Sequence, residues 1–195
     1  MNIYFYCQHV LGIGHFFRSL EICKALGDHD LTLITGGIRP DILLPENVTE
    51  INLPGLMMDP DFSGLISTVE NKPVEEIKNA RIKLLTSLFE NELPEIFLIE
   101  LYPFGRKAFR FELDPLLKKV AKEHKQKCRI ICSLRDILVE KKEPEKYEKR
   151  VIETLNRWFD ALLVHSDPAY LKLDETFDRI DDVQIRSEER RVGKE

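Results

Sequence analysis

The stretch NIYFYCQHVLGIGHFFRSLEICKAL, residues 2–26, decides the fold. Its opening residues are mostly β-branched or aromatic and show no polar period, which is typical of a strand buried on both faces. Two glycines then allow the backbone to turn sharply, and apolar residues recur at helical spacing after them. The stretch therefore predicts a strand over residues 2–7, a tight turn, and a helix that begins at His15 and ends before Gly27.

The same alternation continues along the rest of the chain. Strands are predicted over residues 31–35, 48–53, 95–101, 128–134 and 161–166, and helices over 72–92, 112–126 and 144–158. Strands that alternate with helices of this length are joined in parallel by crossovers, which predicts an α/β fold with a doubly wound, Rossmann-like parallel sheet. Ligands bind such a sheet at the carboxyl ends of its strands, so the loops after the strands hold the informative residues.

The composition fits one globular domain. The chain has 195 residues, of which 43% are hydrophobic and 32% charged, and a net charge of -5. This balance excludes a largely disordered chain, and no overall positive field would gather a nucleic acid, so we expect no nucleic-acid partner. No apolar run reaches the roughly 20 residues of a bilayer span and no signal peptide pattern is present, which predicts a cytoplasmic protein. The four cysteines form no CxxC pair, so we expect reduced thiols and no metal site.

The last ten residues, RSEERRVGKE at 186–195, depart from this pattern. They carry four basic and three acidic residues with no apolar period, and they match the in-frame translation of a widely used sequencing adapter. We therefore predict that residues 1–185 form one Rossmann-like domain and that residues 186–195 are a non-native tail. On this interpretation the natural chain continues past Ile185.

The glycine turn after the first strand is the strongest functional signal. Glycines let the backbone approach a ligand, and the helix N-terminus that follows offers free N–H groups to an anion, so Gly12 and Gly14 are predicted to bind substrate. The dinucleotide fingerprint GxGxxG is disfavoured, because Phe17 replaces its third glycine and no acidic residue directly follows the second strand. A purely structural turn is the alternative.

His15 lies in the first turn of the following helix, at the predicted ligand edge of the sheet. The helix dipole disfavours an imidazolium there, and a neutral imidazole can take a proton from a hydroxyl or from water near pH 7. His15 is therefore the candidate general base, and a histidine that only caps or packs locally is the alternative. Arg18, one turn further on, is predicted to bind substrate, with a contact to an acidic loop residue or a place on the helix surface as its alternatives.

Charged residues also follow the fourth predicted strand. Glu100 ends that strand and could orient His15 or Arg18, or form a buried salt bridge. In the aromatic loop after it, Arg106 and Arg110 could hold a phosphate or carboxylate through bidentate hydrogen bonds while the rings stack on a sugar. Alternatively, the rings belong to the core and the two cations are solvated.

The fifth and sixth strands end in further polar residues. Arg135 and Asp136 end the fifth strand and His165 ends the sixth, so all three are predicted to bind substrate at the same edge of the sheet. Asp136 has a helix cap as its alternative role. Asp167-Pro168 is predicted to start a helix, with Asp as the cap and Pro in the first turn.

The loop PGLMMDPDFSGLIS, residues 54–67, carries apolar side chains at Met57, Met58, Phe62 and Leu65. These adaptable side chains could cover an acceptor or dip into a membrane interface, although no basic cluster supports strong attachment. Packing against the edge of the sheet is the expected use. Weak peripheral association with the inner membrane face is the alternative.

The segments FYCQHVLGIGHFFRSLEICKAL, LIELYPFGRKAFRFEL, CSLRDIL and LLVHSDP together resemble the amino-terminal half of a group of bacterial predicted glycosyltransferases with the GT-B fold. More distantly, the chain is similar to glycosyltransferase family 28 and to the nucleotide-sugar hydrolase of pseudaminic acid synthesis. The resemblance covers most of residues 1–182. It implies two Rossmann-like domains that face each other across a cleft, with the acceptor held mainly by the first domain and the nucleotide sugar mainly by a second domain beyond Ile185.

The resemblance also implies roles for individual residues. Gly12, Gly14 and His15 match the glycine loop and the histidine at the cleft of these proteins, where the histidine is the usual candidate base. We therefore predict a glycosyltransferase that moves a sugar from a nucleotide sugar to a small-molecule, lipid or glycan acceptor, needs no cofactor or metal, and is inactive as this chain alone. The alternatives are a nucleotide-sugar hydrolase, in which His15 activates water, and a non-catalytic flavodoxin-like module that binds a nucleotide or a partner.

Overall fold

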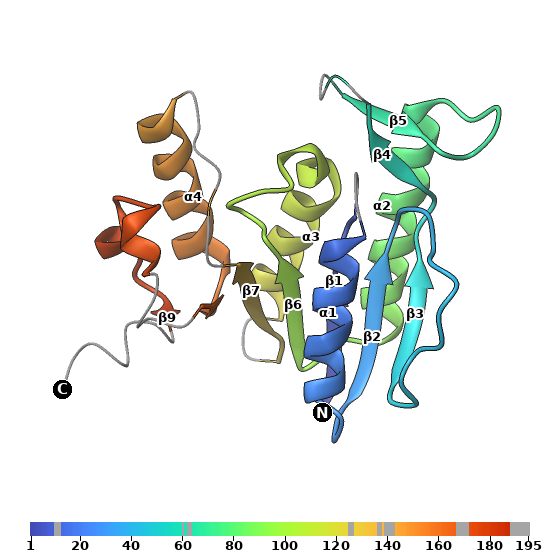
Figure 1. Cartoon of the computed structure of the whole chain (residues 1–195), viewed down its shortest axis with the longest axis horizontal. Coiled ribbons are helices and arrows are strands. Elements are labelled where there is room, and N and C mark those ends of the chain that lie inside the picture. The colour runs from blue at the N-terminus through green and yellow to red at the C-terminus, as the bar shows by residue number, and fades with distance from the viewer. Residues whose placement is uncertain are drawn as a thin grey trace.

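The computed structural model describes residues 1–9, 13–59, 61, 64–124, 127–135, 138, 143–166 and 172–187. These residues form a parallel sheet in the order β3-β2-β1-β6-β7-β8-β9 and a separate two-stranded hairpin, β4-β5 (Figure 1). The strands of the sheet are β1 (Asn2–Tyr6), β2 (Asp30–Thr35), β3 (Val48–Asn52), β6 (Ile96–Glu100), β7 (Arg129–Arg135), β8 (Ala161–His165) and β9 (Arg186–Ser187). The predicted doubly wound α/β fold is confirmed.

Helices cover both faces of the sheet. They are α1 (Gly14–Ala25), α2 (Val74–Asn91), α3 (Arg110–Glu123) and α4 (Pro144–Trp158), with short 3-10 helices η1 (Lys107–Phe109), η2 (Leu173–Glu175) and η3 (Ile180–Asp182). In Figure 1, α1 lies in front of the sheet while α2 and α3 lie behind it. The two faces accordingly carry separate buried clusters, one that includes α1 and one that includes α2, α3 and α4.

Strand β1 shows why the apolar run at the amino terminus forms a central strand. Phe5 belongs to the buried cluster with α1, whereas Tyr4 and Tyr6 belong to the cluster on the opposite face. Burying each large apolar side chain contributes about 1.5–3 kcal/mol relative to leaving it exposed. A shift of one residue in register would exchange the two sets, so the pairing Tyr4↔Thr32 with β2 is fixed by packing on both sides.

The segment 54–67 differs from the predicted loop, because it contains β4 (Leu56–Met58) and β5 (Leu65–Ser67) paired antiparallel. Leu56 is buried in the core, and Met58 and Leu65 pack against it, as expected for packing at the sheet edge. Phe62 lies outside the described residues. Within the described part of the chain, no helix combines the length and the apolar character that crossing a membrane requires.

The first two residues of the predicted tail pair with the sheet. Arg186 and Ser187 form the edge strand β9, which pairs in parallel with Ala161 and Leu162 of β8. Residues 188–195 and the predicted helix start at Asp167-Pro168 lie outside the described residues. The domain boundary at Ile185 therefore stays a prediction.

Candidate functional site

The order of the strands places a change of direction between β1 and β6. From β1 the chain proceeds outward to β2 and β3 on one side, and it resumes at β6 on the other side. In open α/β sheets, ligands bind at such a switch point, outside the carboxyl ends of the strands. Helix α1 begins shortly after β1, so its second residue, His15, lies at this point.

Three side chains from different segments meet there. The Nδ1 atom of His15 lies 2.6 Å from Oε1 of Glu100, at the end of β6. The other carboxylate oxygen, Oε2, accepts hydrogen bonds from Nη2 of Arg106 at 2.9 Å and from its Nε at 3.2 Å. The side chain of Glu100 is only 3% exposed and that of Arg106 8%, whereas His15 keeps 26% of its surface. The histidine is therefore the member of this group that a ligand can reach.

The charge state of Glu100 decides what His15 can do. Burial acts to raise the pKa of the Glu100 carboxyl, but the hydrogen bond from His15 and the charge of Arg106 outweigh burial and hold the pKa below its ordinary value. An ionised carboxylate only accepts hydrogen bonds, so Nδ1 of His15 carries the proton that it shares with Glu100. In a neutral ring, Nε2 is then the proton acceptor, and it has no hydrogen-bond partner among the described residues.

The loop after β6 folds back in a strained conformation that brings Arg106 to Glu100. Leu101 and Arg106 both have left-handed backbones, with φ values of 65° and 56°. Each such non-glycine residue costs on the order of 1 kcal/mol or more and persists only where its surroundings hold it. The N–H of Leu101 donates to the carbonyl of Ser133 at 2.8 Å, and that of Gly105 donates to the carbonyl of Leu101 at 2.7 Å. A Cβ at Gly105 would lie 2.6 Å from Cδ2 of Leu101, so a larger residue there would have to displace the Leu101 side chain.

A second histidine extends the group across β7 and β8. Nε2 of His165 lies 2.7 Å from the hydroxyl oxygen of Ser133, which is itself the register partner of Glu100. Partial burial lowers the pKa of His165, the nearby charge of Arg18 lowers it further, and Glu100 acts in the opposite direction. We call His15, Glu100, Arg106, Ser133 and His165 the switch-point cluster. Ser133 is not among the predicted binding residues. The sequence signal that could have identified it is a polar residue at the end of an apolar strand.

The other predicted residues are divided between this cluster and the rest of the domain. Gly14 is the first residue of α1, and a Cβ there would meet open space. Arg135 ends β7 as the register partner of His165. Arg110 instead pairs with Asp114 on its own helix, with 2.9 Å between Nη2 and Oδ2.

Two predicted residues, Gly12 and Asp136, lie outside the described residues. The aromatic rings of the loop after β6 are in the core rather than offered to a sugar, since Tyr102, Phe104 and Phe109 are all buried. The alternative in which these rings are core residues is therefore the one the structure shows. All four cysteines are free and buried. The described residues contain no group of three His, Cys, Asp or Glu side chains suited to a metal ion.

No family model matches the sequence, and no curated protein matches it either. Among solved structures, the fold is similar to that of apo UGT2 from Phytolacca americana, a UDP-glycosyltransferase, with a TM-score of 0.51 and 12% identity. The match covers 95% of this chain and 51% of that chain. The fold is Rossmann-like and matches part of a GT-B glycosyltransferase. At this identity the likeness shows the fold alone, and the chain spans about half the length of its structural neighbour.

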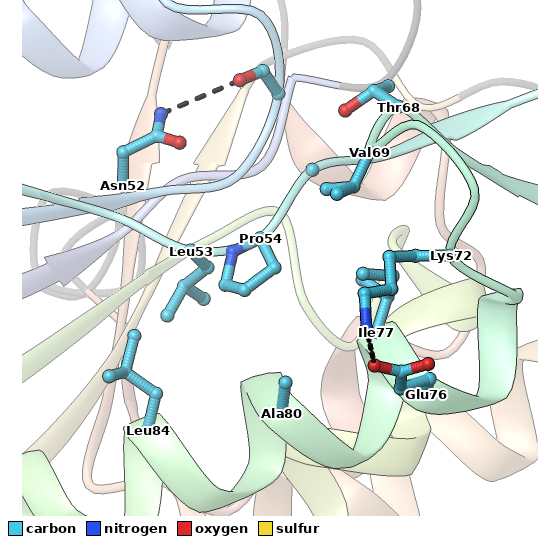
Figure 2. A pocket seen from close by; sticks show the side chains of 12 residues that line it. Asn52, Leu53, Pro54, Thr68, Val69, Lys72, Glu76, Ile77, Ala80 and Leu84 are labelled. Atoms are coloured by element: carbon cyan, nitrogen blue, oxygen red, sulfur yellow. Dashed lines mark hydrogen bonds and ion pairs between the residues drawn. The ribbon is translucent and has the colours of Figure 1, made fainter.

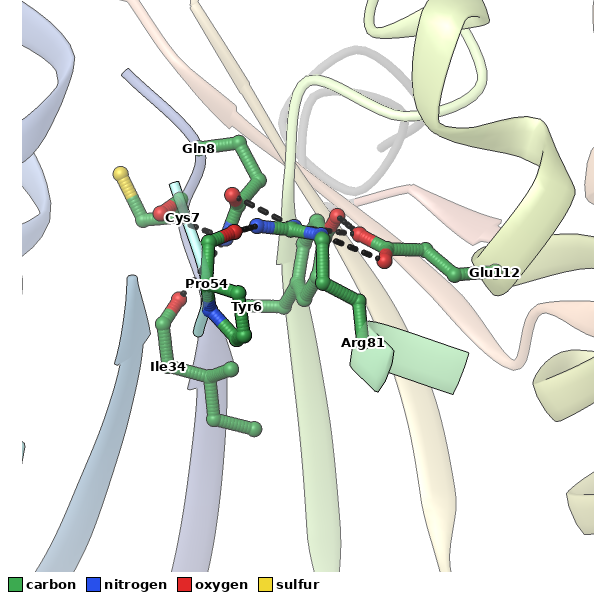
Figure 3. Close-up of polar contacts among 7 residues, drawn as sticks. All are labelled: Tyr6, Cys7, Gln8, Ile34, Pro54, Arg81 and Glu112. Atoms are coloured by element: carbon green, nitrogen blue, oxygen red, sulfur yellow. Dashed lines mark hydrogen bonds and ion pairs between the residues drawn. The ribbon is translucent and has the colours of Figure 1, made fainter. Parts of the chain in front are cut away.

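A second group of polar residues lies inside the domain. The guanidinium of Arg81 donates to both carboxylate oxygens of Glu112, at 2.6 Å and 2.8 Å, and neither side chain has any exposed surface. It also donates to Oε1 of Gln8 and to the carbonyl of Pro54, while the hydroxyl of Tyr6 donates to Glu112 (Figure 3). We call these five residues the buried polar network. It joins the end of β1 to α2 and α3, and its two charged side chains have no exposed surface to offer a ligand.

An open pocket of about 670 Å³ lies at the β3 side of the same sheet edge (Figure 2). Leu53, Pro54, Val69, Ile77 and Leu84 give it apolar walls, and the ion pair between Lys72 and Glu76 lies at its border. None of the predicted site residues lines it. The pocket is framed by the end of β3, the segment after β5 and α2, so sequence periodicity gave no signal for it.

Proposed function

We propose that this chain is the acceptor-side domain of a GT-B glycosyltransferase. In the reaction, an acceptor hydroxyl attacks the anomeric carbon of a nucleotide sugar and Nε2 of His15 takes its proton. The new bond joins the acceptor oxygen to the anomeric carbon, and the bond from that carbon to the nucleotide phosphate breaks with its electron pair leaving on the phosphate. The observation that carries this proposal is the 2.6 Å contact between His15 and the buried Glu100.

Three features of the contact support a general base. Glu100 fixes the tautomer with the proton on Nδ1, which leaves Nε2 to accept. Its negative charge favours the imidazolium that forms as the acceptor loses its proton. Arg106 holds the second carboxylate oxygen, so the carboxylate cannot rotate away from His15 without losing both hydrogen bonds from the guanidinium.

The finer assignments belong to the same proposal. They are a relationship to bacterial enzymes of family 28, a cytoplasmic location, and a nucleotide sugar held mainly by a second domain encoded past Ile185. The acceptor would be a small molecule, a lipid or a glycan. The similarity in fold to a UDP-glycosyltransferase supports the general class of reaction.

The test uses the chain extended along its natural reading frame past Ile185. The enzyme is incubated with a panel of nucleotide sugars and hydroxyl acceptors, and nucleotide release and glycosylated product are measured. His15→Ala should lower kcat by roughly 10²–10⁴-fold, the usual contribution of a positioned general base. Glu100→Gln should cause a similar loss, because the amide can donate to Nδ1 and so favour the tautomer with its proton on Nε2.

A matched control is His29→Ala, since His29 lies in the turn between α1 and β2, at the opposite edge of the sheet. It should keep the full rate. If His15→Ala and His29→Ala behave alike while both bind substrate normally, His15 is not the base. If the unmutated enzyme releases free sugar and no glycosylated product forms with any acceptor, the protein is a nucleotide-sugar hydrolase instead.

A further inference from the structure

Arg18, beside the candidate base, has no counter-ion among the residues that the structure describes. It follows His15 by three positions on α1, so the two side chains lie on the same face of the helix. Arg18 is half-buried, yet it makes no hydrogen bond or ion pair with any described residue. Partial burial takes water from a guanidinium that has five N–H donors to satisfy, which is unfavourable unless a partner replaces the water.

The acidic residue of the site does not supply that partner. Glu100 uses one oxygen for His15 and the other for Arg106, and Arg106 balances its charge. Within the described ranges, no acidic side chain is therefore left to match the positive charge of Arg18. The charge of Arg18 also contributes to the lowered pKa of His165 on β8, so the two side chains are near enough to interact.

His165 is the second donor available at this place. Ser133 holds its Nε2 atom at 2.7 Å, which fixes the orientation of the ring, and the side chain is partly exposed. An anion next to an imidazole favours the protonated ring. Helix α1, which carries Arg18, follows β1, and His165 ends β8; in the sheet, β6 with Glu100 at its end lies between β1 and β8. Arg18 and His165 can therefore hold one anionic group close to His15.

We infer that the acceptor carries an oxyanion, a carboxylate or a phosphate, which Arg18 and His165 bind about one helical turn from the His15 base. This inference rests on the proposed function, because it takes the ligand to be the acceptor on which His15 acts. It narrows the acceptor to acidic sugars, hydroxy acids, phosphate esters and lipids with an anionic headgroup. An uncharged acceptor would leave the guanidinium of Arg18 without a charged partner among the acceptor and the described residues.

Binding can be measured without turnover. We would titrate the 195-residue chain with inorganic phosphate and, separately, with acetate, and follow the imidazole resonances of its histidines by NMR. At least one of the two anions should shift the His165 resonances and raise the pKa of His165. Arg18→Gln should weaken the binding of that anion by roughly tenfold to a hundredfold, which is the range for losing one charge-assisted hydrogen-bond partner. Arg157→Gln removes an exposed arginine at the end of α4 and should leave the affinity unchanged.

The outcomes separate this inference from the proposed function. It is overturned if neither anion perturbs His165, or if Arg18→Gln and Arg157→Gln bind the anion equally well. Arg18→Lys should keep part of the affinity, which shows that the loss in Arg18→Gln does not come from unfolding. His15→Ala should still bind the anion, so a failure of the base assignment leaves this result standing. Sedimentation with phosphatidylglycerol vesicles tests whether the anionic group belongs to a lipid. Arg18-dependent binding to the vesicles indicates a lipid headgroup, and no such binding indicates a soluble acceptor.

Discussion

Replacing Arg81 with methionine should remove a large part of the stability of the domain. The substitution keeps an unbranched apolar stem but removes the guanidinium from the buried polar network. Glu112 would then keep one hydrogen-bond partner among the described residues, the hydroxyl of Tyr6. The side-chain oxygen of Gln8 and the carbonyl of Pro54 would each lose the donor they have now.

The magnitude follows from these losses. Removing one partner of a buried ion pair costs about 3–5 kcal/mol, because the other charge is left without compensation. Each buried acceptor left without a donor adds about 1 kcal/mol or more. The expected loss for Arg81→Met is therefore about 5 kcal/mol or more, against a total stability of about 5–15 kcal/mol for a typical domain.

The assay is urea unfolding followed by circular dichroism. The control is Arg179→Met, since Arg179 forms an exposed pair with Asp182 and its loss should change stability by less than about 1 kcal/mol. The double variant Arg81→Met/Glu112→Leu removes both buried charges and should recover at least half of the lost free energy. The reasoning is refuted if Arg81→Met unfolds at the same urea concentration as Arg179→Met, or if the double variant is as unstable as the sum of the single variants.

Two further predictions use other parts of the domain. A Cβ at Gly36 would overlap Arg81 and Gln8, so Gly36→Ala should destabilise the domain by about 1–3 kcal/mol. A Cβ at Gly14 would meet open space, so Gly14→Ala should be neutral or stabilising by up to about 1 kcal/mol. Thermal unfolding of the two variants measures both effects. Because the pKa of Glu100 is lowered on folding, its ionised form stabilises the domain at pH values above the ordinary carboxyl pKa. This contribution disappears as the pH falls through the lowered pKa. Glu100→Gln should therefore flatten the acid side of the plot of stability against pH, and an unchanged plot would contradict the hydrogen bonds assigned to Glu100.

The elements of the sheet could be predicted because their sequences have strong periods and sharp ends. The strand predicted over 2–7 is β1 at Asn2–Tyr6, and the helix predicted over 144–158 is α4 at Pro144–Trp158. Both faces of β1 are buried, so its sequence carries no polar residue between the first and the last, and Pro144 marks the helix start. Local composition was therefore sufficient for these boundaries.

The hairpin and the side-chain contacts could not be predicted in the same way. Strands β4 and β5 have three residues each, too few to show a period of two. The path of the loop that brings Arg106 to Glu100 depends on left-handed conformations at Leu101 and Arg106, which nothing in their residue types signals. The burial of Arg81 also has no local signal, because an arginine on an amphipathic helix is usually exposed.

The topology predicted from the sequence places His15 and Glu100 at the same edge of the sheet, but it does not predict that their side chains are in contact. His15 and Glu100 are 85 residues apart in the sequence and meet because β1 and β6 are neighbours in the sheet. Glu100 also binds Arg106, so Glu100→Gln perturbs both the base and the strained loop. His15→Ala leaves the Glu100–Arg106 pair in place. If His15 is the base and Glu100 positions it, His15→Ala should lose activity with little loss of stability, whereas Glu100→Gln should lose both. Equal stability losses in the two variants would mean that His15 is chiefly a packing residue.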